Sequence, residues 1–170
     1  NENGSYLAEV TDKTEKIKVE GEELEIGEES VHTATTLASG ELELVEADDD
    51  PSEDGTYRFS NLTSLIYPKE EVNVGTTWTH AFKEDSKKGT KDAEVTYKVE
   101  SEEKLLGFDA VKVSLVGKEK AGSKPFSTTG NIWVRKSDGL MLKFEVEMKN
   151  LPIDDEEVID AAKVVMELKV

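Results

Sequence analysis

Histidine is the residue type most able to exchange protons near neutral pH, and the chain contains only two, His32 and His80. Neither lies in a nucleophile elbow, a metalloprotease helix or another catalytic motif. No cysteine is present, which excludes thiolate nucleophiles, disulfides and cysteine-type zinc sites. The sequence therefore predicts a protein that is not an enzyme.

The aromatic residues near the second histidine are the first candidates for a binding site. If residues 78–82 form a strand, Trp78, His80 and Phe82 share one face, because side chains alternate along a strand. An imidazole between two aromatic rings suits the wall of a ligand pocket, and Trp133 and Tyr97 would join this wall if the sheet curves. The alternatives are a core-edge histidine with one hydrogen bond, or an outward-facing row of aromatic residues.

The acidic loop at residues 46–55 is the only candidate metal site. Asp50, Ser52 and Asp54 occupy alternate positions before a glycine, as in the first half of a calcium-binding loop. Asn61 stands where a bidentate glutamate should close the site, and this excludes an EF-hand. The two remaining interpretations are a looser surface loop that binds Ca²⁺ through these three residues, and a solvated turn without a cofactor.

The elements that must position these residues are strands. Leu140 to Met148 places its odd and even members on opposite faces, with Leu140, Leu142, Phe144, Val146 and Met148 together on one of them. Shorter alternations recur along the chain, and Asp138-Gly139 predicts a tight hairpin before this strand. Strands are also predicted in the following places: Lys16 to Ile26 (two, around Gly21), Val31 to Leu37, Leu42 with Leu44, Tyr57 with Phe59, Val95 to Val99, Val111 to Leu115, Ile132 to Val134 and Val164 to Val170.

These strands predict a mainly β fold in one domain, residues 1–170, in which residues 1–30 give the weakest pattern. We expect a single curved antiparallel sheet of about 8–11 strands, shaped as a half-barrel or barrel. One segment leaves two alternatives. Residues 154–162 read either as a short helix, with Val158 and Ala162 at helical spacing, or as an acidic loop that leads into a strand from Ala161.

The net charge and the hydropathy limit which classes of partner are expected. The net charge of −17 repels phosphate backbones, so nucleic acid is not an expected partner. No run of 18 apolar residues is present, and hence no transmembrane segment is predicted. The start at Asn1, without a leader, suits a mature exported product, and we expect an extracellular or cell-envelope location, with a lipid anchor on a missing N-terminal segment as one form of it.

Residues 68–78 carry a resemblance to a known group. Pro68, Val72, Val74, Gly75 and Trp78 form a P-x₃-V-x-V-G-x₂-W segment, which resembles uncharacterised exported or lipid-anchored prokaryotic β-domains. The strands around residues 107–113 and 130–140 continue the resemblance to Val170. Such domains are similar in outline to lipoprotein-carrier-like half-barrels, whose curved sheet presents an apolar concave face. The resemblance implies a fold and brings no functional residues with it.

Three functions follow as hypotheses. The first is a non-enzymatic envelope or extracellular domain that binds a lipid or another apolar or amphipathic ligand on its concave face. The second is a structural or protein-interaction module of a surface assembly without a small-molecule ligand. The third is a calcium-dependent surface domain. An apolar cavity would favour the first, and an exposed sheet edge would favour the second.

Overall fold

The computed structural model describes residues 6–13, 16–19, 22–25, 29–46, 55–152 and 158–168, with side chains from residue 34 to 43, 55 to 152 and 158 to 168. Over these residues the protein is mainly β, with eleven strands and one helix. Their bounds are β1 Tyr6–Lys13, β2 Lys16–Val19, β3 Glu22–Glu25, β4 Glu29–Thr36, β5 Leu42–Glu46, α1 Thr56–Thr63, β6 Thr77–Phe82, β7 Ala93–Leu105, β8 Phe108–Glu119, β9 Ser127–Arg135, β10 Met141–Pro152 and β11 Val158–Glu167.

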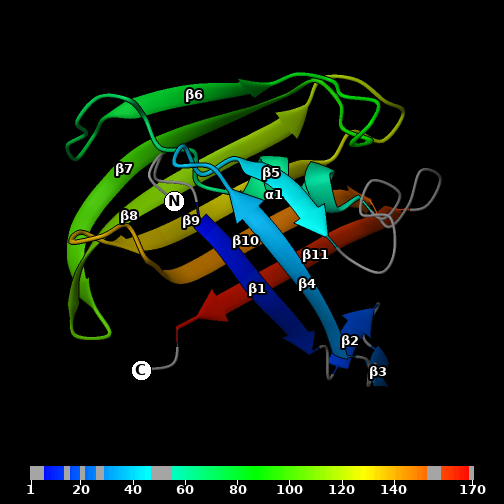
Figure 1. Ribbon diagram of the computed structural model, residues 1–170, viewed down its shortest axis with the longest axis horizontal. Helices are drawn as coiled ribbons and strands as arrows, with labels where there is room; N and C mark the ends of the chain where they lie inside the picture. The colour runs from blue at the N-terminus through cyan, green and yellow to red at the C-terminus, as the bar shows by residue number, and fades with distance from the viewer. Residues whose placement is uncertain are drawn as a thin grey trace.

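The strands form three antiparallel sheets. The largest has the order β11-β10-β9-β8-β7-β6, a second has the order β1-β4-β5, and β2 pairs with β3 alone. The mainly β fold and the curved antiparallel sheet expected from the sequence are confirmed. The strands are divided among three sheets instead of lying in one, and the six-stranded sheet curves around α1 without closing into a barrel (Figure 1).

Local features of the ladder account for the curvature. The register shifts between Val99 and Ser101 and again between Met141 and Lys143, and such bulges bend a strand and increase its twist. Gly130 lies where β9 comes closest to β10, because a Cβ at that position would overlap the carbonyl oxygen of Glu145. Glycine is required there for the close approach of the two backbones.

The concave side of the six-stranded sheet, which we call the inner face, is packed under α1 and the segment that follows it. Leu62 and Ile66 lie in the same buried cluster as inner-face residues from four strands. Gly117 makes room for the helix, because a Cβ there would stand 3.3 Å from Cδ2 of Leu62 and 2.7 Å from Oγ1 of Thr128. The buried inner-face residues are Ala93, Val95, Tyr97, Val113, Leu115, Ile132, Val134, Phe144, Val146 and Met148.

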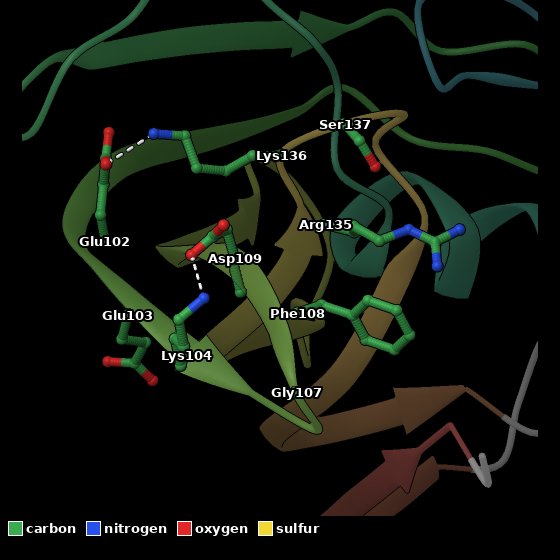
Figure 2. Close-up of a pocket in the computed structure, with 10 residues that line it drawn as sticks. Glu102, Glu103, Lys104, Gly107, Phe108, Asp109, Arg135, Lys136 and Ser137 are labelled. Carbon is green, nitrogen blue, oxygen red and sulfur yellow. Dashed lines mark hydrogen bonds and ion pairs between the residues drawn. The ribbon is translucent and has the colours of Figure 1, made fainter.

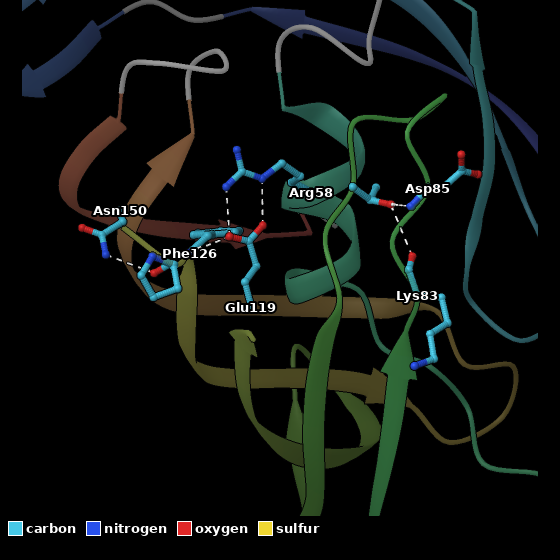
Figure 3. A network of polar contacts seen from close by, with 8 residues as sticks. Arg58, Lys83, Asp85, Glu119, Phe126 and Asn150 are labelled. Atoms are coloured by element: carbon cyan, nitrogen blue, oxygen red, sulfur yellow. Dashed lines mark hydrogen bonds and ion pairs between the residues drawn. The ribbon is translucent and has the colours of Figure 1, made fainter. Parts of the chain in front are cut away.

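A buried ion pair holds the start of α1 against the sheet. The guanidinium of Arg58 donates to both carboxylate oxygens of Glu119, at 2.7 and 2.9 Å, and both side chains are almost fully buried (Figure 3). The backbone N–H of Phe126 donates to the same carboxylate at 2.9 Å. The charge of Glu119 is therefore satisfied by three hydrogen bonds, as a buried charge requires.

Two local predictions were wrong. Tyr57 and Phe59 belong to α1 and not to a strand: the N–H of Phe59 donates to the carbonyl oxygen of Gly55, four residues earlier, at 2.8 Å, as in an α-helix. The helix alternative for residues 154–162 fails over its described part. Residues 158–162 belong to β11, which pairs with β10 from Val158 onward; residues 153–157 lie outside the described residues.

Other local predictions were confirmed. Two short strands, β2 and β3, flank Gly21, and β4 and β5 cover the Thr-rich and Leu42 segments. The turn at Asp138-Gly139 joins β9 to β10, where the N–H of Arg135 donates to the carbonyl oxygen of Leu140 at 2.8 Å.

Candidate interaction site

The structure places Trp78, His80 and Phe82 together on the inner face of β6, each half-buried and each alternating with an exposed residue. The ring of Trp78 stacks on that of Tyr97 with 5.2 Å between centroids. Its indole N–H donates to the carbonyl oxygen of Ile66 at 2.8 Å. Trp78 thereby fixes the segment after α1 on the sheet.

His80 connects β6 to the turn that precedes β5. Its Nε2 lies 2.8 Å from Oε1 of Glu41, and its ring meets Phe82 edge-on with 4.5 Å between centroids. The neighbouring N–H of Tyr67 donates to the carbonyl oxygen of Ser39 at 2.8 Å, in the same turn. The turn between β4 and β5 is thus held against both β6 and the segment after α1.

Tyr97 shows how closely this corner is packed. Its hydroxyl donates to the carbonyl oxygen of Ser64 at 2.7 Å, and burial raises the pKa of the phenol well above its ordinary value. The negative charge of Glu41 raises that pKa further. Glu41 therefore acts electrostatically on the inner face beside β6 and β7.

The structure does not bring Trp133 to this wall. Ile132 and Val134 occupy the inner face, and Trp133, between them in sequence, lies on the opposite, outer face. The ammonium groups of Lys112 and Lys143 lie 5.0 and 5.2 Å from the centre of its ring. Its indole N–H donates to Glu103 at 2.7 Å, and the residue is buried in a small hydrophobic cluster with Ala110 and Leu142.

Strand β6 is an edge of the six-stranded sheet, and the hydrogen bonds of β7 show which of its backbone groups are unused (Figure 1). Val99 of β7 donates to the carbonyl oxygen of Thr76 and accepts from the N–H of Gly75. Since bonding alternates along an antiparallel ladder, the backbone groups of Trp78, His80 and Phe82 face β7. Those of Thr77, Thr79 and Ala81 face away from the sheet.

The free side of β6 carries none of the features that usually protect an edge strand. From Thr77 to Phe82 it has no Lys, Arg, Asp or Glu, no proline and no register shift, and the pairing of both Gly75 and Thr76 with Val99 lies just before it. Within the part of the chain that the structure describes, the outward N–H and C=O groups of Thr77, Thr79 and Ala81 have no hydrogen-bond partner. The side chains of these three residues are small and exposed, which leaves the backbone accessible.

The opposite edge, β11, is built differently. The N–H of Leu168 donates to the carbonyl oxygen of Leu142, so the even-numbered residues of β11 face β10. The backbone groups that face outward are those of the odd-numbered residues, and Lys163 and Glu167 are two of these. Charged side chains at an edge oppose the docking of a further strand, so β6 is the more receptive of the two edges.

A hollow of about 720 Å³ opens at the tips of the β7-β8 and β9-β10 hairpins (Figure 2). Four of its charged groups form two ion pairs, Glu102 with Lys136 at 2.6 Å and Lys104 with Asp109 at 2.8 Å, and Glu103 accepts hydrogen bonds from Ser101 and Trp133. Arg135 lies over the ring of Phe108, 4.8 Å from its centre. Arg135 also pairs with Asp138, so each charged group that lines the hollow has a hydrogen-bond or ion-pair partner.

Metal ligands are not grouped in the described part of the chain, where no cluster of three or more His, Asp or Glu side chains could hold an ion. Asp50, Ser52 and Asp54, the candidate calcium ligands, lie outside the described residues. No helix among the described residues is both long and apolar enough to cross a bilayer.

No family model, no curated protein and no solved structure matches this chain. The site described above therefore rests on its own geometry. Sequence reasoning identified the aromatic face of β6 but missed its free edge, although an uncharged strand without proline was a signal for it.

Proposed function

We propose that the protein is a non-enzymatic module of the cell envelope or the exterior that binds an extended segment of another protein along β6. The observation that supports this most is the set of unused backbone groups on Thr77, Thr79 and Ala81. Addition of a strand to such an edge is a recurring mode of peptide recognition, in which backbone hydrogen bonds supply affinity.

The expected affinity is modest. Each hydrogen bond formed in water contributes about 0.5–1.5 kcal/mol, because the same groups are solvated before binding. Three outward residues offer few such bonds. The free-energy cost of ordering the incoming segment offsets part of what these bonds contribute. A weak, reversible interaction suits one contact within a larger surface assembly.

The inner face gives little support to the hypothesis that the protein carries an apolar ligand. Its side chains are buried together with those that cover them: Tyr97 and Leu115 of the sheet, Leu62 of α1 and Phe126 before β9 are each at 1% exposure or less. The hollow described above lies at the hairpin tips, and a second hollow, of about 370 Å³, lies on the outer face, where Ser114, Asn131 and Glu145 are among its lining residues. A carrier would need the apolar face to be open, so the interaction module is the better-supported proposal.

The test is a selection of phage-displayed random peptides on the wild-type protein and on Ala81→Pro. Proline at this position removes an outward N–H and keeps the bonds between β6 and β7, since Ala81 does not bond to β7. Val165→Pro on β11 is the matched control, because Val165 also faces outward from an edge.

Peptides enriched on the wild type should also bind Val165→Pro and should lose at least tenfold in enrichment on Ala81→Pro. Amide NMR shifts of Thr77, Thr79 and Ala81 should change on addition of such a peptide. Enriched peptides that bind Ala81→Pro as well as the wild type, or a selection without enrichment, would contradict the proposal.

A further inference from the structure

We infer that the β6 edge selects an extended segment with a cationic side chain, lysine or arginine, opposite His80, and apolar side chains two residues to either side. This inference rests on the proposed function and names the class of segment that it would bind. Glu41 and Phe82 lie beside His80, and Trp78 shares its face of β6.

The geometry of a sheet determines where the side chains of an added strand would lie. A strand paired with β6 places alternate side chains on the inner face, opposite Trp78, His80 and Phe82 in turn. Directly opposed Cβ atoms in a sheet are about 4.5–5.5 Å apart. The side chain of the residue opposite His80 can therefore reach the same groups that His80 contacts.

Glu41 is the group that His80 contacts, and it has capacity for another donor. Oε1 lies 2.8 Å from Nε2 of His80, and the only other described partner of the carboxylate is the hydroxyl of Ser39, which donates to Oε2 at the long distance of 3.4 Å. A carboxylate can accept about four hydrogen bonds. The side chain of Glu41 is 34% exposed, so a long cationic side chain can reach it from the edge.

The residues that flank His80 favour apolar neighbours. Trp78 and Phe82 are only half-buried although they pack against the buried core. A valine or leucine opposite each ring would cover its remaining exposed surface and be stabilised by the burial. The predicted pattern is thus apolar, any residue, cationic, any residue, apolar.

The charge of the whole protein selects against the obvious alternative occupant, a second copy of this chain. Each copy carries a formal net charge of −17, and two such molecules repel each other. The same field attracts a cationic segment. The partner is therefore a different polypeptide, neutral or basic, and not a symmetric copy.

The experiment compares three capped peptides of about seven residues. The first has the sequence T-V-T-K-T-V-T, in which threonine alternates with valine, lysine and valine. This sequence is identical in both directions. In the second, glutamine replaces the lysine. The third keeps the central glutamine and carries lysine in place of the outer-face threonine next to it, which preserves the charge but points it away from Glu41. Affinities are measured by fluorescence anisotropy on the wild type, Glu41→Gln and Ala81→Pro.

The central-lysine peptide should bind the wild type about threefold tighter than either other peptide, as partly exposed ion pairs allow. This preference should vanish on Glu41→Gln, while the glutamine peptide binds both proteins equally and shows that the edge is intact. Equal binding of all three peptides to the wild type would overturn the selectivity and leave the proposed function standing. Failure of every peptide to distinguish the wild type from Ala81→Pro would overturn both.

Discussion

At the scale of single residues, the buried charges give the sharpest predictions about stability. The chain has two arginines, and they occupy opposite environments: Arg58 is 6% exposed and pairs with a carboxylate that is 2% exposed, whereas Arg135 pairs with Asp138 at the surface. Removing one partner of a buried pair leaves an uncompensated charge. The two positions therefore form a natural comparison.

Arg58→Met should lower the free energy of unfolding by about 3–5 kcal/mol, because Glu119 would keep only the N–H of Phe126 as a partner. Urea unfolding, followed by tryptophan fluorescence, measures the change. Arg135→Met is the matched control and should cost much less. Equal losses at the two positions would show that α1 is not held by the buried pair.

Asp138 gives a prediction about pH. The guanidinium of Arg135, followed by the N–H of Leu140, lowers the pKa of this carboxyl to about 2. The folded-state pKa lies below the ordinary value of about 3.9, so the turn gains stability above that value and loses it as the pH falls toward 2. Carboxyl carbon NMR should place the titration midpoint of Asp138 near pH 2 in the wild type and nearer the ordinary value in Arg135→Met. An ordinary midpoint in the wild type would refute the assignment.

At the same scale, the sequence predicted which side chains of β6 share a face. It did not predict which groups these side chains contact. Alternation is enough to put Trp78, His80 and Phe82 on one face. It cannot show that Glu41, which is 39 positions earlier, reaches His80. Trp133 was misplaced for a related reason, since Ile132 and Val134 compete with it for the inner face and no local signal decides between them.

At the scale of elements, the contact between α1 and the sheet depends on Gly117. A methyl group there would meet Oγ1 of Thr128, which donates to the carbonyl oxygen of Leu62 at 2.8 Å. Gly117→Ala should therefore push α1 outward, break this hydrogen bond and lower the free energy of unfolding by about 1–3 kcal/mol.

Calorimetry can measure the effect of Gly117→Ala. The neighbouring Val116→Ala is the control: Val116 is 58% exposed on the outer face, so its truncation should change the midpoint little. If the two variants melt together, α1 tolerates the added methyl group and the close approach at Gly117 has no energetic importance.

The long strands of the curved sheet were predictable because each has one apolar face, and the alternation of β10 and the turn before it are strong local signals. The short elements were not. Tyr57 and Phe59 alternate for only three residues, too few to distinguish a strand from a turn of helix. Val158 and Ala162 have helical spacing, but the exposed ladder of β10 pairs with this segment and makes it a strand. Tertiary pairing overrides weak local preference.

At the scale of the whole molecule, charge is distributed unevenly. Residues 1–55 contain 18 of the 38 Asp and Glu residues and only 3 of the 21 Lys and Arg residues. They account for most of the net charge of −17, and the rest of the chain is nearly balanced. The repulsion among these carboxylates opposes compact structure.

Added salt should therefore stabilise the protein at neutral pH. Raising NaCl from about 20 mM to about 500 mM shortens the screening distance several-fold and should raise the midpoint of thermal unfolding. The same titration at pH 4.5, close to the isoelectric point of the sequence, is the control and should show a much smaller rise. A midpoint that is insensitive to salt at pH 7 would mean that charge repulsion contributes little.

The order of strands in the curved sheet has a consequence for how the chain folds. From β6 to β11 each strand pairs with the one that precedes it in sequence, so every hairpin can close a short loop. Proteins dominated by such local contacts fold faster than those with distant pairings. α1 contacts strands as distant in sequence as β10, and its docking closes the longest loops. We therefore expect the meander to form early and the helix to settle onto it last, as the step that completes the core.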